Sequence, residues 1–184
     1  FNRIPLVLET FADLDTPLSI YLKLANKPYS YLLESVQGGE RFGRYSFIGL
    51  PAQTRISVTG SAVSVLHGES VAEQVQTADP LEFLRAYLAR FKVASLPGLP
   101  RFCGGLVGSF GYDVVRYVEP KLAHLALKPD PIGTPDILLL QSEEIAIVDN
   151  LSGKLLLVVY ADPRNPLAYA HARERLRQLL LALR

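Results

Sequence analysis

The sequence contains one cysteine, no methionine and no long uninterrupted apolar run. A single cysteine, Cys103, cannot form an internal disulfide bond. Together with the lack of a signal-like leader, this favours a reducing, cytoplasmic setting. A membrane-spanning helix needs about 20 consecutive apolar residues, and no run approaches that length. The missing methionine, the initiator included, leads us to expect a piece of a longer protein.

An excess of charge of one sign is also lacking, because the formal net charge is +1 over 184 residues. This near-neutral balance argues against a dominant nucleic-acid partner, which would need a basic face. Arg173, Arg175 and Arg177 cluster near the end, but Glu174 lies among them, and we interpret this cluster as a solvated helix face. Hydrophobic residues make up 49% and charged residues 20%. This composition is typical of a globular protein with one domain or two small ones.

Three expected helix starts share one pattern, in which a capping side chain precedes proline: Thr16-Pro17, Asp79-Pro80 and Asn165-Pro166. The side chain can accept hydrogen bonds from first-turn amides, and proline suits the first helical position. Glu82, three residues after Asp79, further predicts a capping box. Helical spacing predicts three apolar faces, formed by Leu18, Tyr21, Leu22 and Ala25; by Leu81, Leu84 and Leu88; and by Leu176, Leu179, Leu180 and Leu183.

Runs of β-forming residues separated by turn residues predict strands. These runs cover residues 4–8, 29–35, 45–50, 55–59, 62–67, 104–112, 137–140, 145–149 and 155–160. Residues 149–153 predict a hairpin connection. Short links between successive strands favour antiparallel pairing, because parallel pairing needs long crossovers. We therefore predict an α+β fold, mainly antiparallel β-sheet with a few packed helices.

The residue types that usually carry catalysis or bind metals show no functional spacing. His67, His124 and His171 are far apart and lack the pattern of metal ligands. Cys103 has no base beside it, and we interpret it as a buried apolar residue. The sequence therefore predicts no catalytic residue and no metal or cofactor site in this chain.

Three glycines, Gly105, Gly108 and Gly111, lie within one predicted strand. Their pattern does not fit the dinucleotide-binding fingerprint or the phosphate-binding P-loop. Glycine within a strand usually marks a bulge or a close approach of another backbone. We favour packing over ligand contact for this segment.

A predicted hairpin over residues 32–46 is the best candidate for a binding site. Its first strand ends in Glu34-Ser35, a glycine-rich turn reverses the chain, and Arg44 begins the return. A carboxylate, a hydroxyl and a guanidinium together can hold an amino-acid zwitterion, with its carboxylate on arginine and its ammonium on glutamate or on backbone carbonyls. From these residues alone, a salt-bridged surface hairpin without a ligand is an equal alternative.

At these residues the chain resembles the amino-terminal domain of the anthranilate synthase component I family. The resemblance rests on residues 29–35, 39–46 and 104–113, and residues 2–5 and 14–17 also fit. It therefore spans essentially the whole chain. The Leu-Leu-Glu-Ser stretch at residues 32–35 is the more specific motif, whereas the glycine strand is shared with aminodeoxychorismate synthase component I.

The resemblance implies the two-domain fold of chorismate-utilising enzymes, with residues 1–184 as an amino-terminal regulatory domain. It implies that L-tryptophan, as feedback inhibitor, binds at Leu33, Glu34, Ser35 and Arg44. The chorismate-binding residues and the glutamates that bind Mg²⁺ are expected in a carboxy-terminal domain absent from this chain, so we expect no activity from the chain alone. The implied protein partners are that domain and a glutamine amidotransferase subunit, with no nucleic acid and no membrane.

The leading hypothesis is thus a tryptophan-sensing domain of an enzyme that converts chorismate plus glutamine or ammonia to anthranilate. One alternative is the equivalent domain of aminodeoxychorismate synthase component I, in folate synthesis; residues 32–46 favour anthranilate synthase. A second alternative is a free-standing amino-acid-binding or interaction module. The missing initiator methionine and the apolar last helix argue against such a module.

Overall fold

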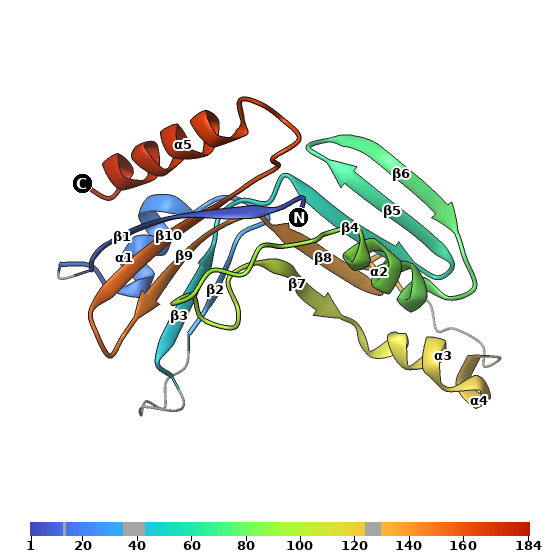
Figure 1. Cartoon of the computed structure of the whole chain (residues 1–184). Coiled ribbons are helices and arrows are strands. Elements are labelled where there is room, and N and C mark those ends of the chain that lie inside the picture. Colours follow the sequence, from blue (N-terminus) through green and yellow to red (C-terminus); the bar gives the residue numbers. More distant parts are fainter. Residues whose placement is uncertain (13, 35–42, 124–129) are drawn as a thin grey trace. The chain divides into compact units, whose positions relative to one another are not determined.

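The computed structural model describes residues 1–12, 14–34, 43–123 and 130–184, and the chain divides into two compact units (Figure 1). Unit 1 combines Phe1–Ala52, Phe91–Gly105 and Ser142–Arg184, and unit 2 combines Gln53–Arg90 and Leu106–Gln141. A five-stranded sheet forms the centre of each unit. The predicted α+β class with mainly antiparallel strands is confirmed.

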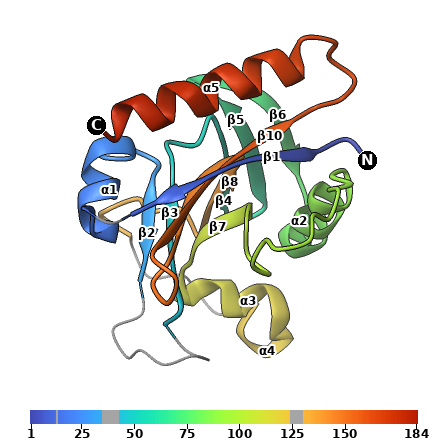
Figure 2. The same cartoon turned by 60° about the vertical axis from the view of Figure 1, so that its left-hand side comes forward.

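The sheet of unit 1 has the strand order β1-β10-β9-β3-β2. Its strands are β1 (Ile4–Phe11), β10 (Lys154–Ala161), β9 (Glu144–Asp149), β3 (Tyr45–Gly49) and β2 (Tyr31–Leu33). The pairings are antiparallel, and the first strand lies beside the last, with Ile4 opposite Ala161. Helices α1 (Pro17–Leu24) and α5 (Ala168–Ala182) pack on one face of this sheet (Figure 2).

Apolar residues between this sheet and its two helices form the core of unit 1. Leu157 of β10 and Leu176 and Leu179 of α5 are buried there, which confirms the predicted apolar face of α5. The opposite face of the sheet buries Ile145, Ile147, Leu156 and Val158. Segment Phe91–Gly105 of the same unit contributes Phe102 and Cys103 to that second cluster.

The predicted apolar face of α1 is confirmed only in part: Ala25 is fully buried and Tyr21 packs against the core. Leu18 and Leu22 are more than half exposed, whereas Ile20 is fully buried and Leu24 packs beside it. Residues spaced three or four apart fit either face of so short a helix, and contact with the sheet selects the one that contains Ile20. The prediction that Cys103 is a buried apolar residue is also wrong. This residue is only half-buried, and its Sγ lies 3.2 Å from Tyr160 Oη.

The sheet of unit 2 has the order β6-β5-β4-β8-β7. Its strands are β6 (Ser70–Gln76), β5 (Ala62–His67), β4 (Thr54–Thr59), β8 (Ile137–Ser142) and β7 (Gly105–Phe110). The sequence did not predict β6. Helix α2 (Pro80–Ala89) follows β6, and the short helices η1 (Tyr112–Val114), α3 (Val115–Val118) and α4 (Pro120–Ala123) follow β7.

Only part of the predicted face of α2 is buried. Leu84 is buried, but Leu88 is largely exposed, and Tyr87 takes its place in the packing. The hydroxyl of Tyr87 donates a hydrogen bond to Gln141 Oε1 at 2.6 Å. A tyrosine can face the core because this buried polar atom has a partner.

Two of the three predicted helix caps are confirmed. Thr16 caps α1 in a reciprocal capping box with Ser19, and Asp79 caps α2 by accepting from the amide of Glu82. The box predicted at Asp79 is wrong, because the Glu82 carboxylate binds Arg85 and the Asp79 amide donates to a threonine hydroxyl. A box needs both bonds, and here only one forms.

The third predicted helix start is also wrong. Helix α5 begins at Ala168, after Leu167, rather than at the Asn165-Pro166 pair. The side chain of Asn165 accepts from the Leu167 amide at 3.0 Å, so it closes a turn ahead of the helix. Short polar side chains cap turns and helices through the same local hydrogen bonds, and this makes the two hard to separate from sequence.

The packing interpretation of the glycine strand is confirmed at Gly108. A Cβ atom there would lie 1.9 Å from the carbonyl oxygen of Leu138 on β8. At Gly111 it would lie 3.2 Å from the carbonyl oxygen of Asp136. Glycine thus lets β7 approach the neighbouring backbone closely, as expected for glycine in a strand.

Candidate functional site

The predicted hairpin exists as the antiparallel pair β2 and β3. Tyr31 lies opposite Gly49, and Leu33 opposite Phe47. Residues opposite each other in a ladder project from the same face, so Leu33 and Phe47 are neighbours. Leu33 is 45% exposed and Glu34 is exposed. Ser35 lies outside the described residues.

The short strand β2 is fixed to β3 by one aromatic side chain. The ring of Tyr31 covers Gly49, where a Cβ atom would lie 1.9 Å from a ring carbon. The Tyr31 hydroxyl is 2.7 Å from Ser142 Oγ, and burial raises the pKa of this tyrosine. A three-residue strand therefore holds a defined register, which positions Leu33 and Glu34 at its end.

Aromatic side chains extend the apolar surface beside Leu33. The ring centroids of Tyr45 and Phe47 are 6.1 Å apart, and Phe102 meets Phe47 edge-on at 5.1 Å. Edge-on and offset pairs of this kind are favourable for aromatic rings. The hairpin thus borders a cluster of three aromatic rings.

Arg44, at the start of the returning arm, has a bidentate partner that the sequence did not predict. Its Nε donates to both carboxylate oxygens of Asp149 at 3.1 and 3.2 Å, and its Nη2 donates to Oδ2 at 2.7 Å. The guanidinium also lies 4.9 Å from the centroid of the Tyr45 ring. The Arg44 guanidinium, more than any other group, lowers the pKa of Asp149 to about 2. Arg44 is thus held by a charged partner rather than extended freely into solvent.

The turn between β9 and β10 supplies that partner, and residues 149–153 form the predicted hairpin connection. Asp149 Oδ1 accepts from the amides of Leu151 and Ser152 at 3.1 and 3.4 Å. The next residue, Asn150, contacts the returning arm at Gly43, Arg44 and Ser46. Sequence reasoning identified this turn but not its role, since aspartate and asparagine are ordinary turn residues.

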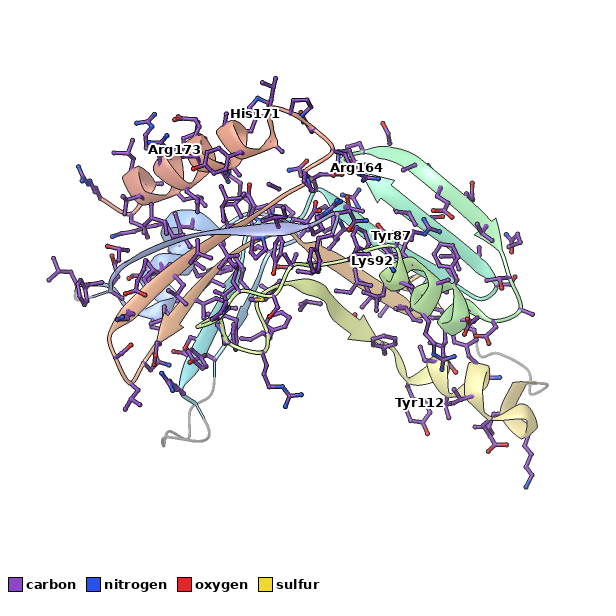
Figure 3. The ribbon with its side chains drawn as sticks, in the orientation of Figure 1. Tyr87, Lys92, Tyr112, Arg164, His171 and Arg173 are labelled. Carbon is purple, nitrogen blue, oxygen red and sulfur yellow. The ribbon has the colours of Figure 1, made fainter. Side chains whose placement is uncertain are left out.

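The described parts of the chain hold no cluster of three or more His, Cys, Asp and Glu that could bind a metal ion. His67 is hydrogen-bonded to Thr54, and His124 lies outside the described residues. His171 and Arg173 are exposed residues of α5 (Figure 3). Within the same described ranges, no helix is long and apolar enough to cross a membrane.

The basic cluster of α5 is a largely solvated face, as interpreted from the sequence. Arg177 binds Glu174 of the same helix, and Arg175 binds Glu144 of β9. Arg173 is exposed. These contacts neutralise part of the positive charge, so the helix does not present a row of unpaired arginines.

No protein-family model matches the chain. Relatives from Neisseria meningitidis and Pseudomonas putida, both named anthranilate synthase component 1, are 56% and 55% identical to it over 186 and 184 residues. The alignments cover 100% of this chain. The chain is homologous to part of anthranilate synthase component 1. The predicted relationship is therefore confirmed, and the chain spans 38% and 37% of the length of these two relatives.

A solved structure supports the same fold. The crystal structure of anthranilate synthase component I from Streptococcus pneumoniae superimposes with a TM-score of 0.61 at 24% sequence identity. The match covers 94% of this chain and 35% of that protein. The fold thus persists where less than a quarter of the residues are identical. Homology to component 1 is supported by the N. meningitidis and P. putida sequences.

Proposed function

We propose that residues 1–184 form the amino-terminal regulatory domain of an anthranilate synthase. The full-length enzyme would convert chorismate plus glutamine or ammonia to anthranilate in tryptophan biosynthesis, and this domain would sense L-tryptophan as feedback inhibitor. The observation that carries the proposal is identity of 55–56% over the whole chain to proteins named anthranilate synthase component 1. Its single cysteine suits a cytoplasmic enzyme.

The geometry of the hairpin supports an amino-acid site. Leu33 and the aromatic cluster at Phe47 offer an apolar surface suited to an indole ring. Glu34 offers a carboxylate for an ammonium group, and Arg44 a guanidinium for a carboxylate. Ser35 follows Glu34 in the sequence and would supply a hydroxyl. Tryptophan carries an indole ring, an ammonium group and a carboxylate, which are complementary to these groups of the protein.

The chemistry of chorismate is proposed to take place in the part of the enzyme outside this chain. The described residues do not fit Mg²⁺, which prefers several oxygen ligands around one point. The Mg²⁺ site and the chorismate contacts would belong to the carboxy-terminal domain, and ammonia would come from a glutamine amidotransferase subunit. Inhibition then requires that tryptophan bind one conformation of the enzyme better than another.

Two substitutions of Ser35 in the full-length enzyme test this function. Loss of one neutral hydrogen bond costs about 0.5–1.5 kcal/mol, so Ser35→Ala should weaken tryptophan inhibition a few-fold to about tenfold. Ser35→Phe should block the site and abolish inhibition. The measurement is anthranilate formation against tryptophan concentration, relative to each variant's uninhibited rate. If the Ser35→Phe curve coincides with that of the parent enzyme, the hairpin is not the sensor.

The isolated chain provides the complementary test. With chorismate, Mg²⁺ and ammonia it should form no anthranilate above a protein-free control, as followed by anthranilate fluorescence. Calorimetry should detect weak tryptophan binding or none, because the other wall of the site would lie outside this chain. The chain contains no tryptophan, so indole fluorescence would report only the added ligand and provides a second readout. Turnover by the isolated chain would contradict the proposed division of labour.

A further inference from the structure

The position of the Asp149 carboxylate is set by contacts that do not involve Arg44. It belongs to the last residue of β9, and two amides of its own turn donate to its Oδ1 atom. The backbone carbonyl of Asp149 also accepts from the Gly153 amide at 2.8 Å, and Gly153 has a φ of +68° that suits this tight turn. The residue is 6% exposed. The position of this carboxylate is therefore set by the sheet and the turn.

The guanidinium of Arg44 takes its orientation from that fixed carboxylate. A bidentate pair restrains both the distance and the plane of the guanidinium, which a single contact does not. The Nε and Nη2 atoms of the guanidinium face Asp149. The Arg44 side chain is nevertheless 40% exposed, so it still reaches solvent. Among the described residues, Arg44 Nη1 has no hydrogen-bond partner and remains able to donate to a ligand.

Asn150 holds the main chain of the same arm. Its amide donates to the carbonyl of Arg44 at 2.8 Å, and its Nδ2 donates to the carbonyl of Gly43 at 3.2 Å. Nδ2 also donates to Ser46 Oγ at 3.0 Å, and Ser46 is fully buried. Two adjacent residues of one turn thus fix both the side chain and the backbone of the returning arm.

We propose that Asp149 and Asn150 are positioning residues for tryptophan inhibition, which hold Arg44 and the arm around it in the arrangement that receives the ligand carboxylate. The proposal rests on the function proposed above, and it adds two residues more than 100 positions away from the hairpin in the sequence. In this proposal Arg44 contacts the ligand, and Asp149 affects tryptophan binding only by positioning Arg44.

The test uses the full-length enzyme and measures the tryptophan concentration that halves each variant's own uninhibited rate. Hydrogen bonds to charged groups contribute more than neutral ones, so Asp149→Asn should raise this concentration at least about tenfold. Arg44→Gln should have a comparable effect. Because the two residues act as one unit, the double variant should stay within about twofold of the larger single effect.

Glu144→Gln is the matched control. Glu144 lies on the same strand and forms an equally bidentate pair, with Arg175 Nε at 3.0 Å from both oxygens and Nη2 at 2.8 Å. That pair joins β9 to α5 and does not touch the hairpin. A general loss of stability would affect both carboxylate variants, whereas loss of positioning should shift inhibition only in Asp149→Asn. Asn150→Ala provides a second variant if Asp149→Asn does not fold, with an expected weakening of a few-fold.

The outcomes separate this inference from the proposed function. If Ser35→Phe abolishes inhibition while Asp149→Asn and Asn150→Ala match the parent enzyme, the positioning role is wrong and the sensor stands. If Ser35→Phe also matches the parent, both proposals fail. Additive effects of Asp149→Asn and Arg44→Gln would show that Asp149 does not act through Arg44. An equal shift in Glu144→Gln would reduce the effect to general stability and would likewise overturn the inference.

Discussion

Central strands and edge strands differ in burial, and this holds in both five-stranded sheets. In unit 1, the neighbouring strands β9 and β10 are buried almost throughout, because apolar clusters lie on both faces of that sheet. In unit 2, the strands β6 and β7 at the two edges of the sheet are mostly exposed. A strand covered on both faces tends to be continuously apolar, whereas one that is half covered alternates. Burial therefore concentrates stability in the central strands of each sheet, and the edge strands contribute less.

The comparison also locates the candidate site. The hairpin of β2 and β3 belongs to the sheet with the larger buried centre, and its register is fixed by contacts with β9 and the turn after it. A binding site needs rigid support so that its polar groups keep their geometry. We expect substitutions in unit 1 to disturb stability more than those at the exposed edges of unit 2.

The largest difference in unfolding free energy should be between substitutions of a buried and of an exposed strand residue. Leu157 of β10 is 0% exposed, and Leu157→Ala should lower the free energy of unfolding by about 2–5 kcal/mol through lost contacts and the cavity left behind. Val71 of β6 is 57% exposed, and Val71→Ala should change it by no more than about 0.5 kcal/mol. Urea denaturation followed by circular dichroism measures both. Equal losses would remove the contrast between central and edge strands.

A smaller effect should distinguish two glycines, and here unit 2 is the more sensitive. Gly108→Ala places a Cβ atom 1.9 Å from a backbone carbonyl oxygen and should cost about 1–3 kcal/mol in unfolding free energy, because a strand must move. Gly49→Ala in unit 1 meets the ring of Tyr31, whose displacement would break its contact with Ser142 but would move no neighbouring backbone. Its cost should be lower, in the same denaturation assay. A larger loss for Gly49→Ala would mean that the Tyr31 ring cannot yield.

The smallest effect should be the pH dependence of an ion pair. The pKa of Asp149 is lowered, so its pair with Arg44 stabilises the fold above the unfolded value of about 3.9, and this stabilisation is lost as the pH falls towards about 2. Asp149→Asn should lower the free energy of unfolding by about 1 kcal/mol at pH 7 and by almost nothing near pH 2. In unit 2, Glu73→Gln removes the more exposed pair with Arg90 and should cost less at pH 7. A pH-independent difference for Asp149→Asn would contradict this origin.

Much of the fold could be predicted from the sequence because local patterns and packing agree. The run over residues 155–160 predicted β10, and the leucines of the last helix predicted its buried face. Strand β6 was missed because Glu73 and Gln74 interrupt its apolar pattern, and a strand at the sheet edge tolerates such residues. The face of α1 was predicted only in part, because the sheet decides which side of a short helix is covered.

The candidate site likewise contains residues that could be predicted from the sequence and one that could not. Leu33, Glu34, Ser35 and Arg44 could be selected because they are close together in the sequence and resemble a known motif. Asp149 could not be selected, because its contact with Arg44 depends on β9 lying beside β3 in the sheet. Strand order over so long a separation is a property of the assembled sheet, and no local pattern in the sequence indicates it.

The pairing of β1 with β10 has a consequence for biosynthesis. Ile4 lies opposite Ala161, so roughly 150 residues must be translated after β1 before its partner strand leaves the ribosome. At about 5–20 residues per second, this delay is on the order of 10–30 s. During that time the apolar residues of β1 lack their place in the sheet, and an unpaired strand is prone to associate with other chains.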